Sequence, residues 1–541
     1  MKTKKELILT LFCILVIASI LKVILLLFNC FPFNADEAVV GLMARHILHG
    51  ERPVFFYGQS YMGSLDAFLV SIAFSVLGIH VWVIRAVQII LYLFVIVTSI
   101  EIAHLVFMNS NAKWMVAALL AIPPVNVTLY TTVSLGGYGE ALLIGNLILL
   151  IGILIIKTIE KPRFSHKPWL NLLLGGLMGL GLWANALTLI YTIPTLLHLI
   201  WVLFQHRNRY SIKRIIRNSL IFLLGLGIGA LPWWLYALQN GFHQLISEML
   251  GAAVAVEKGT WLERTGNHFL SLIILGGTVL LGLRPPWEVR WLALPLIPIV
   301  VFSWGWIFSK WLRSMINRQF ESQSQRLFLG VILVFCVGFL FTSFGVDPSG
   351  RYFVPLWIML TLIAAGAITS AIKNQTYQII LVATILIFNL TGTIQCALRN
   401  PPGITTQFDA ATVVDHRTLP KLITFLKDHN EQYGYSNYWV AYPLAFLSDE
   451  EIIFIPGLPY HQDLRYTPRD NRYLPYTERV MKSQKVAYIT THHPLLEEYL
   501  REKFTELQIM WLEETIGDYH IFYNLSKPIQ ATELGLGFSY P

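Results

Sequence analysis

Two adjacent carboxylates, Asp36 and Glu37, stand shortly after the first apolar segment of the chain. Apolar residues follow them at helical spacing as far as Gly50, so we expect an amphipathic helix at a membrane surface. Both acids suit the start of such a helix, because Asn34 and Glu37 can form a capping box and Asp36 complements the helix dipole. The chemical alternative is that an ionised Asp36 acts as a general base and accepts a proton from an attacking hydroxyl group.

A third carboxylate, Glu140, follows the glycine-rich stretch 134–139 at the expected start of another helix. A carboxylate at the end of a membrane helix can simply be hydrated, whereas ionisable residues at membrane depth commonly face a cavity. The glycines would let a ligand or another helix approach the backbone closely. Glu140 is therefore a second candidate for acid–base chemistry.

Arg351 and Tyr352 lie in a short loop, 347–355, between two apolar segments. Such an arginine can extend toward the interface while the tyrosine joins the aromatic belt of a membrane protein. The functional alternative is that the guanidinium of Arg351 binds a phosphate group through paired hydrogen bonds.

Three more polar residues, Tyr57, Gln59 and Tyr61, precede the apolar segment 63–78 and could contact a sugar. Asp66, within that segment, could serve either structure or function. The four cysteines form no CxxC pair, and the histidines and carboxylates show no metal-ligand spacing such as HExxH. We therefore predict no cofactor and leave a divalent metal open.

The composition identifies the environment in which these residues act. Of the 541 residues, 55% are hydrophobic and only 13% are charged, against roughly 25% charged in soluble domains. So few charges cannot cover a core this apolar in water, which excludes a soluble enzyme, a disordered chain and a nucleic-acid-binding protein. Residues 1–395 carry 27 Lys and Arg against 14 Asp and Glu, while residues 396–541 carry 13 against 18.

The basic excess in the apolar part is typical of the positive-inside rule. It gathers in three clusters that we expect in the cytoplasm: Lys157, Lys161, Arg163 and Lys167; Arg207, Arg209, Lys213, Arg214 and Arg217; and Lys310, Arg313, Arg318 and Arg326. The apolar segments are 7–28, 63–78, 82–107, 114–131, 140–156, 169–184, 186–204, 218–238, 268–283, 291–308, 327–344, 355–372 and 377–395.

These clusters and segments predict a polytopic α-helical membrane protein with about 11–13 transmembrane helices. The count is eleven if 63–78 lies at the outer interface and 291–308 does not span. The first segment, 7–28, is long enough to be an uncleaved helix rather than a signal peptide. The N-terminus is then cytoplasmic, and the loop 29–81 and the region 396–541 lie outside.

The region 396–541 has a different character. Charged segments near 418–431 and 494–504 predict helices, and they alternate with short runs that predict strands. The expected strands are Tyr438–Ala441, Ile452–Ile455, Val486–Thr490, Leu507–Leu512 and His520–Tyr523. We therefore predict two domains: a membrane-embedded domain, 1–395, and a small C-terminal extracytoplasmic α/β domain, 396–541.

Together these residues resemble those of the GT-C superfamily of membrane glycosyltransferases, in the branch of the protein O-mannosyltransferases and the lipid A aminoarabinose transferase. The resemblance covers roughly residues 7–395, and it rests on the order in which the matching residues occur along the chain. The matching residues are Asp36-Glu37, Ala44, Ile47, Gly50, Tyr57-Gly58, Phe74–Gly78, Arg85, Glu140, Arg351-Tyr352 and Pro355. The segment Tyr438–Leu444 is similar to one in the outer domain of bacterial members. The stretch Gln59–Gly63 stands where the aminoarabinose transferases have Lys-Pro-Pro.

The resemblance implies a GT-C-like fold and an enzyme that takes a sugar from a polyprenyl-phosphate donor on the outer face of the membrane. The sugar passes, with inversion, to a lipid-linked or protein acceptor. By resemblance Asp36 is the base and Glu140 the second acidic residue, while Arg351 and Tyr352 hold the leaving phosphate. The remaining expected substrate-binding residues are Glu37, Tyr57, Gln59 and Tyr61. The implied location is the plasma membrane of a bacterium, among membrane lipids.

Two other functions remain open on the sequence alone. A lipid or polysaccharide transporter or flippase without catalysis would need paired ionisable groups deep in its helices, and the candidates are Lys22 and Glu101. A glycan-binding membrane protein would bind glycans through 396–541 alone. The acidic candidates cluster in the expected external loops, which favours an enzyme at the interface.

Overall fold

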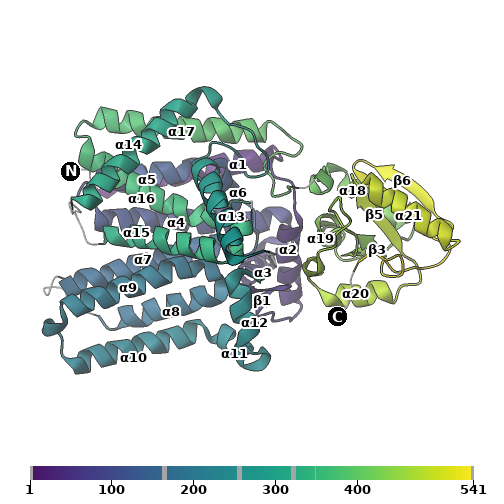
Figure 1. Cartoon of the computed structure of the whole chain (residues 1–541), viewed down its shortest axis with the longest axis horizontal. Helices are drawn as coiled ribbons and strands as arrows, with labels where there is room; N and C mark the ends of the chain where they lie inside the picture. Colours follow the sequence, from purple (N-terminus) through teal and green to yellow (C-terminus); the bar gives the residue numbers. More distant parts are fainter. Residues whose placement is uncertain are drawn as a thin grey trace. The chain divides into compact units, whose positions relative to one another are not determined.

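The structure, a computed structural model, describes residues 4–160, 167–252, 259–317, 324–347, 349–408 and 410–537. The chain forms two compact units. The first consists of Met1–Phe28, Ser60–Asp66 and Arg85–Leu398, and the second of Asn29–Gln59, Ala67–Ile84 and Arg399–Pro541. The first unit is helical, and the second contains a mixed sheet with its helices (Figure 1).

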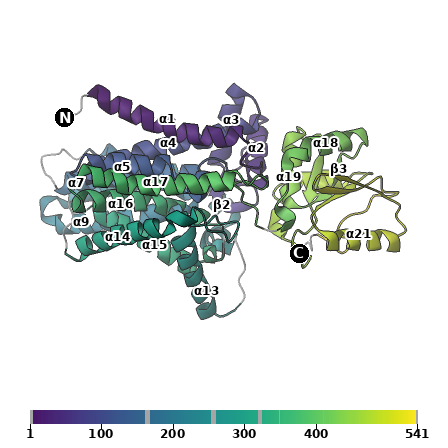
Figure 2. The same ribbon diagram turned by 90° about the horizontal axis from the view of Figure 1, so that it is seen from above.

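Helices make up most of the chain, as the apolar composition predicts. In chain order they are α1 (Lys4–Leu27), α2 (Ala35–Leu48), α3 (Leu65–Leu77), α4 (Val81–Val106), α5 (Asn111–Ala121), α6 (Val125–Tyr130), α7 (Tyr138–Glu160), α8 (Trp169–Ala184), α9 (Leu189–Gln205), α10 (Ile212–Gly229), α11 (Leu231–Asn240), α12 (Phe242–Ser247), α13 (Trp261–Ile274), α14 (Ile297–Ile316), α15 (Gln325–Phe341), α16 (Val354–Ala371), α17 (Gln375–Ala397), α18 (Leu419–Asp428), α19 (Tyr438–Leu447), α20 (Leu474–Met481) and α21 (Pro494–Glu506). Within the first unit, α13 runs across the direction of α14 to α17 in both Figure 1 and Figure 2.

Among the described residues, seven helices are long and apolar enough to cross a membrane, or eight if the bent pair α10 and α11 forms one span. Shorter apolar helices include α3, α8 and α15. A polytopic α-helical membrane protein is therefore confirmed. Fewer helices reach full span length than the 11–13 expected from the sequence, because several apolar segments fold as shorter or broken helices.

Two apolar segments differ from the sequence expectation. The segment 291–308 is expected from the sequence not to span. It lies largely in α14, and α14 together with the short turn before it, Leu294–Ile316, is long enough to cross a membrane. Its prolines fall before and within the first turn, where a helix tolerates them. The segment 114–131 divides at Pro123-Pro124 into α5 and α6. Consecutive prolines lack the backbone N–H groups that a helix needs, and they restrict the backbone conformation of the preceding residue. Three of the expected cytoplasmic cations lie outside the described residues: Lys161, Arg163 and Arg318.

Helices α7 to α10 lie side by side within the first unit (Figure 1). α8 and α10 pack backbone to backbone. A Cβ added at Gly179 would lie 2.3 Å from the carbonyl oxygen of Leu226, and one at Gly225 would lie 2.2 Å from that of Leu172. Small residues four apart on each helix allow this approach, as in other membrane helix pairs.

Replacing Gly225 with alanine is expected to weaken this pair, since the new methyl group would meet the backbone of Leu172. Overpacking of this kind costs about 1–3 kcal/mol. Gly227 is the matched control, because it lies on the same helix and a Cβ there meets no atom within 4 Å. Thermal unfolding in detergent should show a lower midpoint for Gly225→Ala and an equal or higher one for Gly227→Ala. Equal losses in both variants would contradict the close packing.

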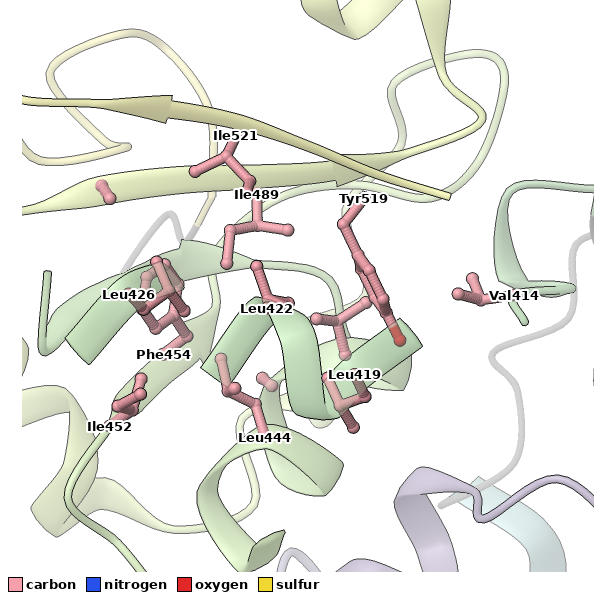
Figure 3. Close-up of a cluster of buried hydrophobic side chains, with 13 residues drawn as sticks. Val414, Leu419, Leu422, Leu426, Leu444, Ile452, Phe454, Ile489, Tyr519 and Ile521 are labelled. Atoms are coloured by element: carbon pink, nitrogen blue, oxygen red, sulfur yellow. The ribbon is translucent and has the colours of Figure 1, made fainter. Parts of the chain in front are cut away.

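The second unit is built on a five-stranded mixed sheet in the order β4-β3-β5-β7-β6. β3 pairs in parallel with β4 and β5, while β7 pairs antiparallel with β5 and β6. Figure 3 shows Leu422 and Leu426 of α18 and Leu444 of α19 in one apolar cluster with Ile489 and Ile521 of the sheet. The expected C-terminal α/β region is therefore present. The strands of the chain are β1 (Phe55–Phe56), β2 (Gln59–Gly63), β3 (Tyr433–Ser436), β4 (Ile453–Pro456), β5 (Ala487–Thr491), β6 (Leu512–Ile516) and β7 (Tyr519–Tyr523).

The sequence prediction for this region is correct for β4, β5 and β7 and wrong for two strands. Tyr438–Ala441 begins α19 instead, and Leu507–Leu512 precedes β6, which begins only at Leu512. α19 is buried along almost its whole length, so its sequence has no polar face from which a helical period could be recognised. β3, directly before α19, is missing from the prediction.

Helix α2 packs against α19 within the second unit. Gly41 of α2 allows the contact, because a Cβ there would lie 2.5 Å from Cε2 of Phe446. The guanidinium of Arg45 lies 5.1 Å from the centroid of the same ring and forms an ion pair with Asp449. The helix expected at a membrane surface is therefore largely covered by protein, and residues 29–59 group with the C-terminal region.

Candidate active site

The start of α2 fixes the position of Asp36. Asn34 is the N-cap: its backbone is extended, and its side-chain oxygen accepts a hydrogen bond of 2.9 Å from the backbone N–H of Glu37. This is the cap expected from the sequence, and it does not use the Asp36 side chain. Glu37 is fully buried, whereas Asp36 is half-buried.

Asp36 contacts a tyrosine that lies 402 positions later in the chain. The hydroxyl of Tyr438, the first residue of α19, donates a hydrogen bond to Oδ1 of Asp36. Burial raises the pKa of Tyr438 well above its usual value, and the charge of Asp36 raises it further, so Tyr438 remains a donor at physiological pH. None of the described residues donates a hydrogen bond to the second carboxylate oxygen, Oδ2.

Arg472 lies over the ring of Tyr438, with Cζ 5.3 Å from the ring centroid. When the side-chain amide of Gln59 is oriented with its oxygen toward Arg472, Arg472 donates two hydrogen bonds to that oxygen, of 2.8 Å from Nη1 and 3.0 Å from Nη2. Gly58 has a φ of +73°, which glycine adopts readily, and a Cβ there would lie 3.0 Å from Cδ of Arg472. The predicted site residue Gln59 is thus joined to Tyr438 through Arg472.

Asp470 adds a second carboxyl group. Burial raises its pKa to about 7; Arg472 opposes this shift and Asp36 adds to it. Tyr442 of α19 holds the backbone here, because its hydroxyl donates to the Asp470 carbonyl oxygen at 3.2 Å and accepts from the Arg472 N–H at 2.6 Å. We call five side chains the Asp36 cluster: Asp36, Gln59, Tyr438, Asp470 and Arg472.

The raised pKa of Asp470 predicts a pH-dependent stability. The folded protein binds the proton of the Asp470 carboxyl group more tightly than the unfolded chain does. The contribution of this group to the free energy of unfolding is therefore full below about pH 4 and is lost as the pH rises to about 7. Each pKa unit corresponds to about 1.4 kcal/mol. The variant Asp470→Asn should therefore gain melting temperature relative to wild type between about pH 4 and pH 7. The exposed Asp428 is the control, and a constant difference across this range for Asp470→Asn would contradict the assignment.

Tyr57 belongs to another hydrogen-bonded group of the second unit. Its hydroxyl donates to Oε2 of Glu51 at 2.8 Å and lies 2.9 Å from Nδ1 of His46. Nε2 of His46 lies 3.0 Å from Oε1 of Glu450. Burial raises the pKa of Glu450, but hydrogen bonds from His46 and Tyr476 outweigh it and hold the pKa at about 2. This group ties α2 to the residues that follow α19.

In the first unit, Arg351 begins the short 3-10 turn Arg351–Phe353 that leads into α16, and it follows Gly350, whose φ is +70°. Its guanidinium forms an ion pair with the carboxylate of Asp347 and lies 5.1 Å from the centroid of the Tyr352 ring. The Arg351 side chain is 23% exposed, and its buried Nε makes no hydrogen bond to the described residues. Arg351 therefore keeps donor capacity beyond its ion pair.

Helix α6 holds the backbone beside Arg351. Nδ2 of Asn126 donates to the carbonyl oxygen of Gly350 at 3.0 Å, and the hydroxyl of Tyr130 donates to that of Ser349 at 3.2 Å. The N–H of Ser349 in turn donates to Oδ1 of Asp347 at 2.7 Å. The partner of Arg351 is thus itself fixed, which preorganises the guanidinium.

An apolar cavity of about 230 Å³ lies beside this loop. The rings of Tyr61 and Phe344 are in edge contact with centroids 5.6 Å apart, and those of Phe344 and Tyr352 are 4.9 Å apart. Tyr352, the residue after Arg351, is part of the lining, and an apolar cavity of this kind suits the hydrophobic tail of a ligand. Its lining includes Tyr61, Leu250, Phe335, Phe339, Phe344 and Tyr352.

Glu140 lies in the first turn of α7, and its carboxyl group is buried beside that of Asp66. Asp66 accepts hydrogen bonds from the hydroxyl of Ser134 and, at 2.8 Å, from Nε2 of Gln88. Asp66 is therefore a buried carboxyl neighbour of Glu140. Within the described ranges, no group of three or more His, Cys, Asp or Glu could hold a metal ion.

Lys22, a transport candidate on the sequence, is buried in α1. Its ammonium donates hydrogen bonds of 2.8 Å and 2.6 Å to Thr131 and of 2.8 Å to Thr132, and it lies 4.6 Å from the centroid of the Tyr92 ring. Lys22 thus ties α1 to the end of α6. The other candidate, Glu101, is exposed.

The structure places the predicted site residues in two groups. Glu37, Tyr57 and Gln59 accompany Asp36 in the second unit, and Tyr61, Glu140 and Tyr352 accompany Arg351 in the first. Sequence reasoning missed Asp470 and Arg472, which no motif marks. Tyr438 carries a signal, because it opens the segment Tyr438–Leu444 that resembles bacterial GT-C outer domains.

No protein-family model matches the sequence, and no curated protein matches it. The fold, however, is similar to that of solved structures of ArnT and of an archaeal oligosaccharyltransferase. Two crystal structures of ArnT from Cupriavidus metallidurans are similar over nearly the whole chain. The form bound to undecaprenyl phosphate has a TM-score of 0.61 at 11% identity, and the match covers 97% of this chain and 99% of that one. The apo form has a TM-score of 0.60 at 12% identity, covering 96% and 98%.

A second enzyme has the same fold over a smaller part of its own length. The oligosaccharyltransferase from Archaeoglobus fulgidus, in its apo form, matches with a TM-score of 0.51 at 13% identity. The match covers 89% of this chain and 69% of that one. At 11–13% identity these similarities concern the fold.

Proposed function

We propose that this protein is a membrane glycosyltransferase that moves a sugar from a polyprenyl-phosphate donor to a lipid-linked or protein acceptor. The observation that carries the proposal is Arg351, a fixed guanidinium with an unused donor, whose neighbour in the chain, Tyr352, lines an apolar cavity. A phosphate with an isoprenoid tail has the matching chemistry. The ArnT structure of the same fold contains undecaprenyl phosphate, which supports this ligand class.

In the proposed reaction the acceptor hydroxyl loses its proton to Asp36 as its oxygen attacks the anomeric carbon of the sugar. The bond between that carbon and the phosphate oxygen breaks, and its electron pair leaves with the polyprenyl phosphate. Arg351 stabilises the charge that grows on the leaving phosphate. Attack and departure on opposite faces of the sugar invert the anomeric configuration, as in inverting glycosidases.

The other predicted residues take supporting roles in this proposal. Tyr352 and Tyr61 line the cavity for the donor, Gln59 and Tyr57 are assigned to substrate binding, and Glu140 with Asp66 forms a second acidic pair. Glu37 supports the start of α2. Residues 1–395 form the membrane domain and residues 396–541 the extracytoplasmic domain of a bacterial plasma-membrane protein. Attack on the outer face follows from the basic clusters that we assign to the cytoplasm.

A donor panel tests the proposal. Purified protein in detergent is incubated with radiolabelled polyprenyl-phosphate sugars, and the release of polyprenyl phosphate is measured with and without extracted membrane lipids and peptides as acceptors. Time-dependent consumption of one donor would support the enzyme and name its sugar. Donor that binds but is never consumed would overturn the proposal and favour a carrier. Binding of free glycans by the protein without donor consumption would favour a glycan-binding protein.

A further inference from the structure

Tyr438 joins the C-terminal region to the proposed base. It stands at the start of α19 after the N-cap Asn437, and its ring packs in edge contact against Trp439 and Tyr442, with centroids 5.2 Å and 5.3 Å apart. The side chain is almost completely buried. Its hydroxyl nevertheless points to a carboxylate and donates to Oδ1 of Asp36.

We propose that Tyr438 is a positioning residue for the Asp36 base: its hydroxyl holds one carboxylate oxygen, so that Oδ2 is presented to the acceptor hydroxyl. This inference rests on the proposed function and gives the C-terminal region a part in the reaction. An aspartate on a helix can turn about two side-chain bonds, and a hydrogen bond to one oxygen selects one orientation. A preorganised base saves the reorganisation that a mobile one would need in the transition state.

The surroundings of Tyr438 favour this role over packing alone. Burial and the charge of Asp36 keep the phenol protonated, so it serves as a donor and not as a second base. Arg472 lies over the ring and is held in turn by Gln59. The groups that face Asp36 from α19 and from the stretch before α20 are therefore the neutral Tyr438, the cation Arg472 and the partly protonated Asp470.

The test is Tyr438→Phe, which removes the hydroxyl and keeps the ring beneath Arg472. Transfer is measured with the full chain at saturating and limiting donor and acceptor. We expect kcat to fall roughly ten- to a hundredfold, with KM for both substrates within about twofold, because an orienting contact acts in the transition state. In the Asp36→Asn background, Tyr438→Phe should lower kcat by less than about twofold, because the base that Tyr438 orients is already absent.

Tyr488→Phe is the matched control. Tyr488 is equally buried, and its hydroxyl donates at 2.7 Å to the carbonyl oxygen of Ile529, so this variant loses a phenolic hydrogen bond in the same unit without touching Asp36. A second variant, Arg472→Lys, keeps the charge but lacks the planar group over the Tyr438 ring. It should also lower kcat, by a smaller factor than Tyr438→Phe.

The outcomes separate this inference from the proposed function. If wild type transfers sugar and Tyr438→Phe keeps its kcat, the positioning role is wrong while the enzyme stands. Two results would also overturn the positioning role, because they would show a purely structural effect. One is that Tyr438→Phe loses no more kcat than Tyr488→Phe. The other is that Tyr438→Phe lowers kcat as much in the Asp36→Asn background as in wild type. If wild type consumes no donor at all, the proposed function fails, and this inference fails with it. Melting temperatures of all variants identify any that do not fold.

Discussion

Asp36→Asn is expected to lower the rate of sugar transfer by roughly a hundred- to ten-thousandfold, the range that a general base contributes. The amide is close to the carboxylate in size and can still accept the hydrogen bond from Tyr438, so the start of α2 should keep its structure. Asn34 provides the helix cap independently of residue 36. Transfer is measured at saturating donor and acceptor, where the loss appears in kcat.

Donor binding provides the control for this variant. The dissociation constant of the polyprenyl-phosphate donor should stay within about threefold of wild type, because the proposed base acts on the acceptor and not on the phosphate. Asp428→Asn, at an exposed carboxylate in the same unit, should keep full activity. An Asp36→Asn protein with wild-type turnover would show that Asp36 is not the base.

Arg351→Gln is expected to lower transfer by roughly a hundred- to a thousandfold, comparable to the loss of one transition-state donor in other enzymes. It should also raise KM for the donor, because the guanidinium binds the phosphate before and during its departure. Arg351→Lys keeps a positive charge but loses the paired geometry, so it should recover only part of the activity.

Removing Arg351 alone leaves Asp347 without its ion-pair partner, and this carboxylate side chain is only 7% exposed. A buried charge without a partner destabilises the fold, which could lower activity without any role in catalysis. The double variant Arg351→Gln with Asp347→Asn removes that charge. Its melting temperature should return toward wild type while transfer stays low. Recovery of both stability and transfer would contradict a role for Arg351 in binding phosphate.

The helix of the proposed base is predictable from local sequence. Asn34 before Asp36-Glu37, and apolar residues at helical spacing after them, define the start of α2 because capping and periodicity are short-range effects. The same holds for the loop of Arg351, where a glycine and a change from apolar to polar residues mark the end of one helix and the start of another. The GT-C resemblance added the order of these motifs.

The contacts of Asp36 are not predictable in this way. Tyr438 lies 402 positions later, and no local pattern encodes a hydrogen bond over that distance. α19 also looks like a strand in the sequence, since α2 and the sheet cover it from several sides. Arg472 and Asp470 stand in a stretch without helical or strand periodicity, and only the folded unit brings them to Asp36.

The membrane segments show a third limit. The basic clusters give a count of crossings, but they do not tell whether one apolar segment forms one helix or two. Pro123-Pro124 divides a segment that has the length of a full span into α5 and α6. The prolines of α14 stand at its start, where they are compatible with one continuous helix. Whether an apolar segment forms one helix or two therefore depends on where its prolines stand, and not on their presence alone.

The proposed sugar transfer is tested most directly by following one labelled donor in sealed vesicles. Purified protein is reconstituted, loaded with a polyprenyl-phosphate sugar carrying label in both sugar and lipid, and then supplied with acceptor. For a glycosyltransferase we expect the sugar label to move to the acceptor with inverted anomeric configuration while the lipid label stays in polyprenyl phosphate, and Asp36→Asn to stop this transfer. Intact donor that crosses the bilayer with both labels together, equally in wild type and Asp36→Asn, would rule out sugar transfer and identify a transporter.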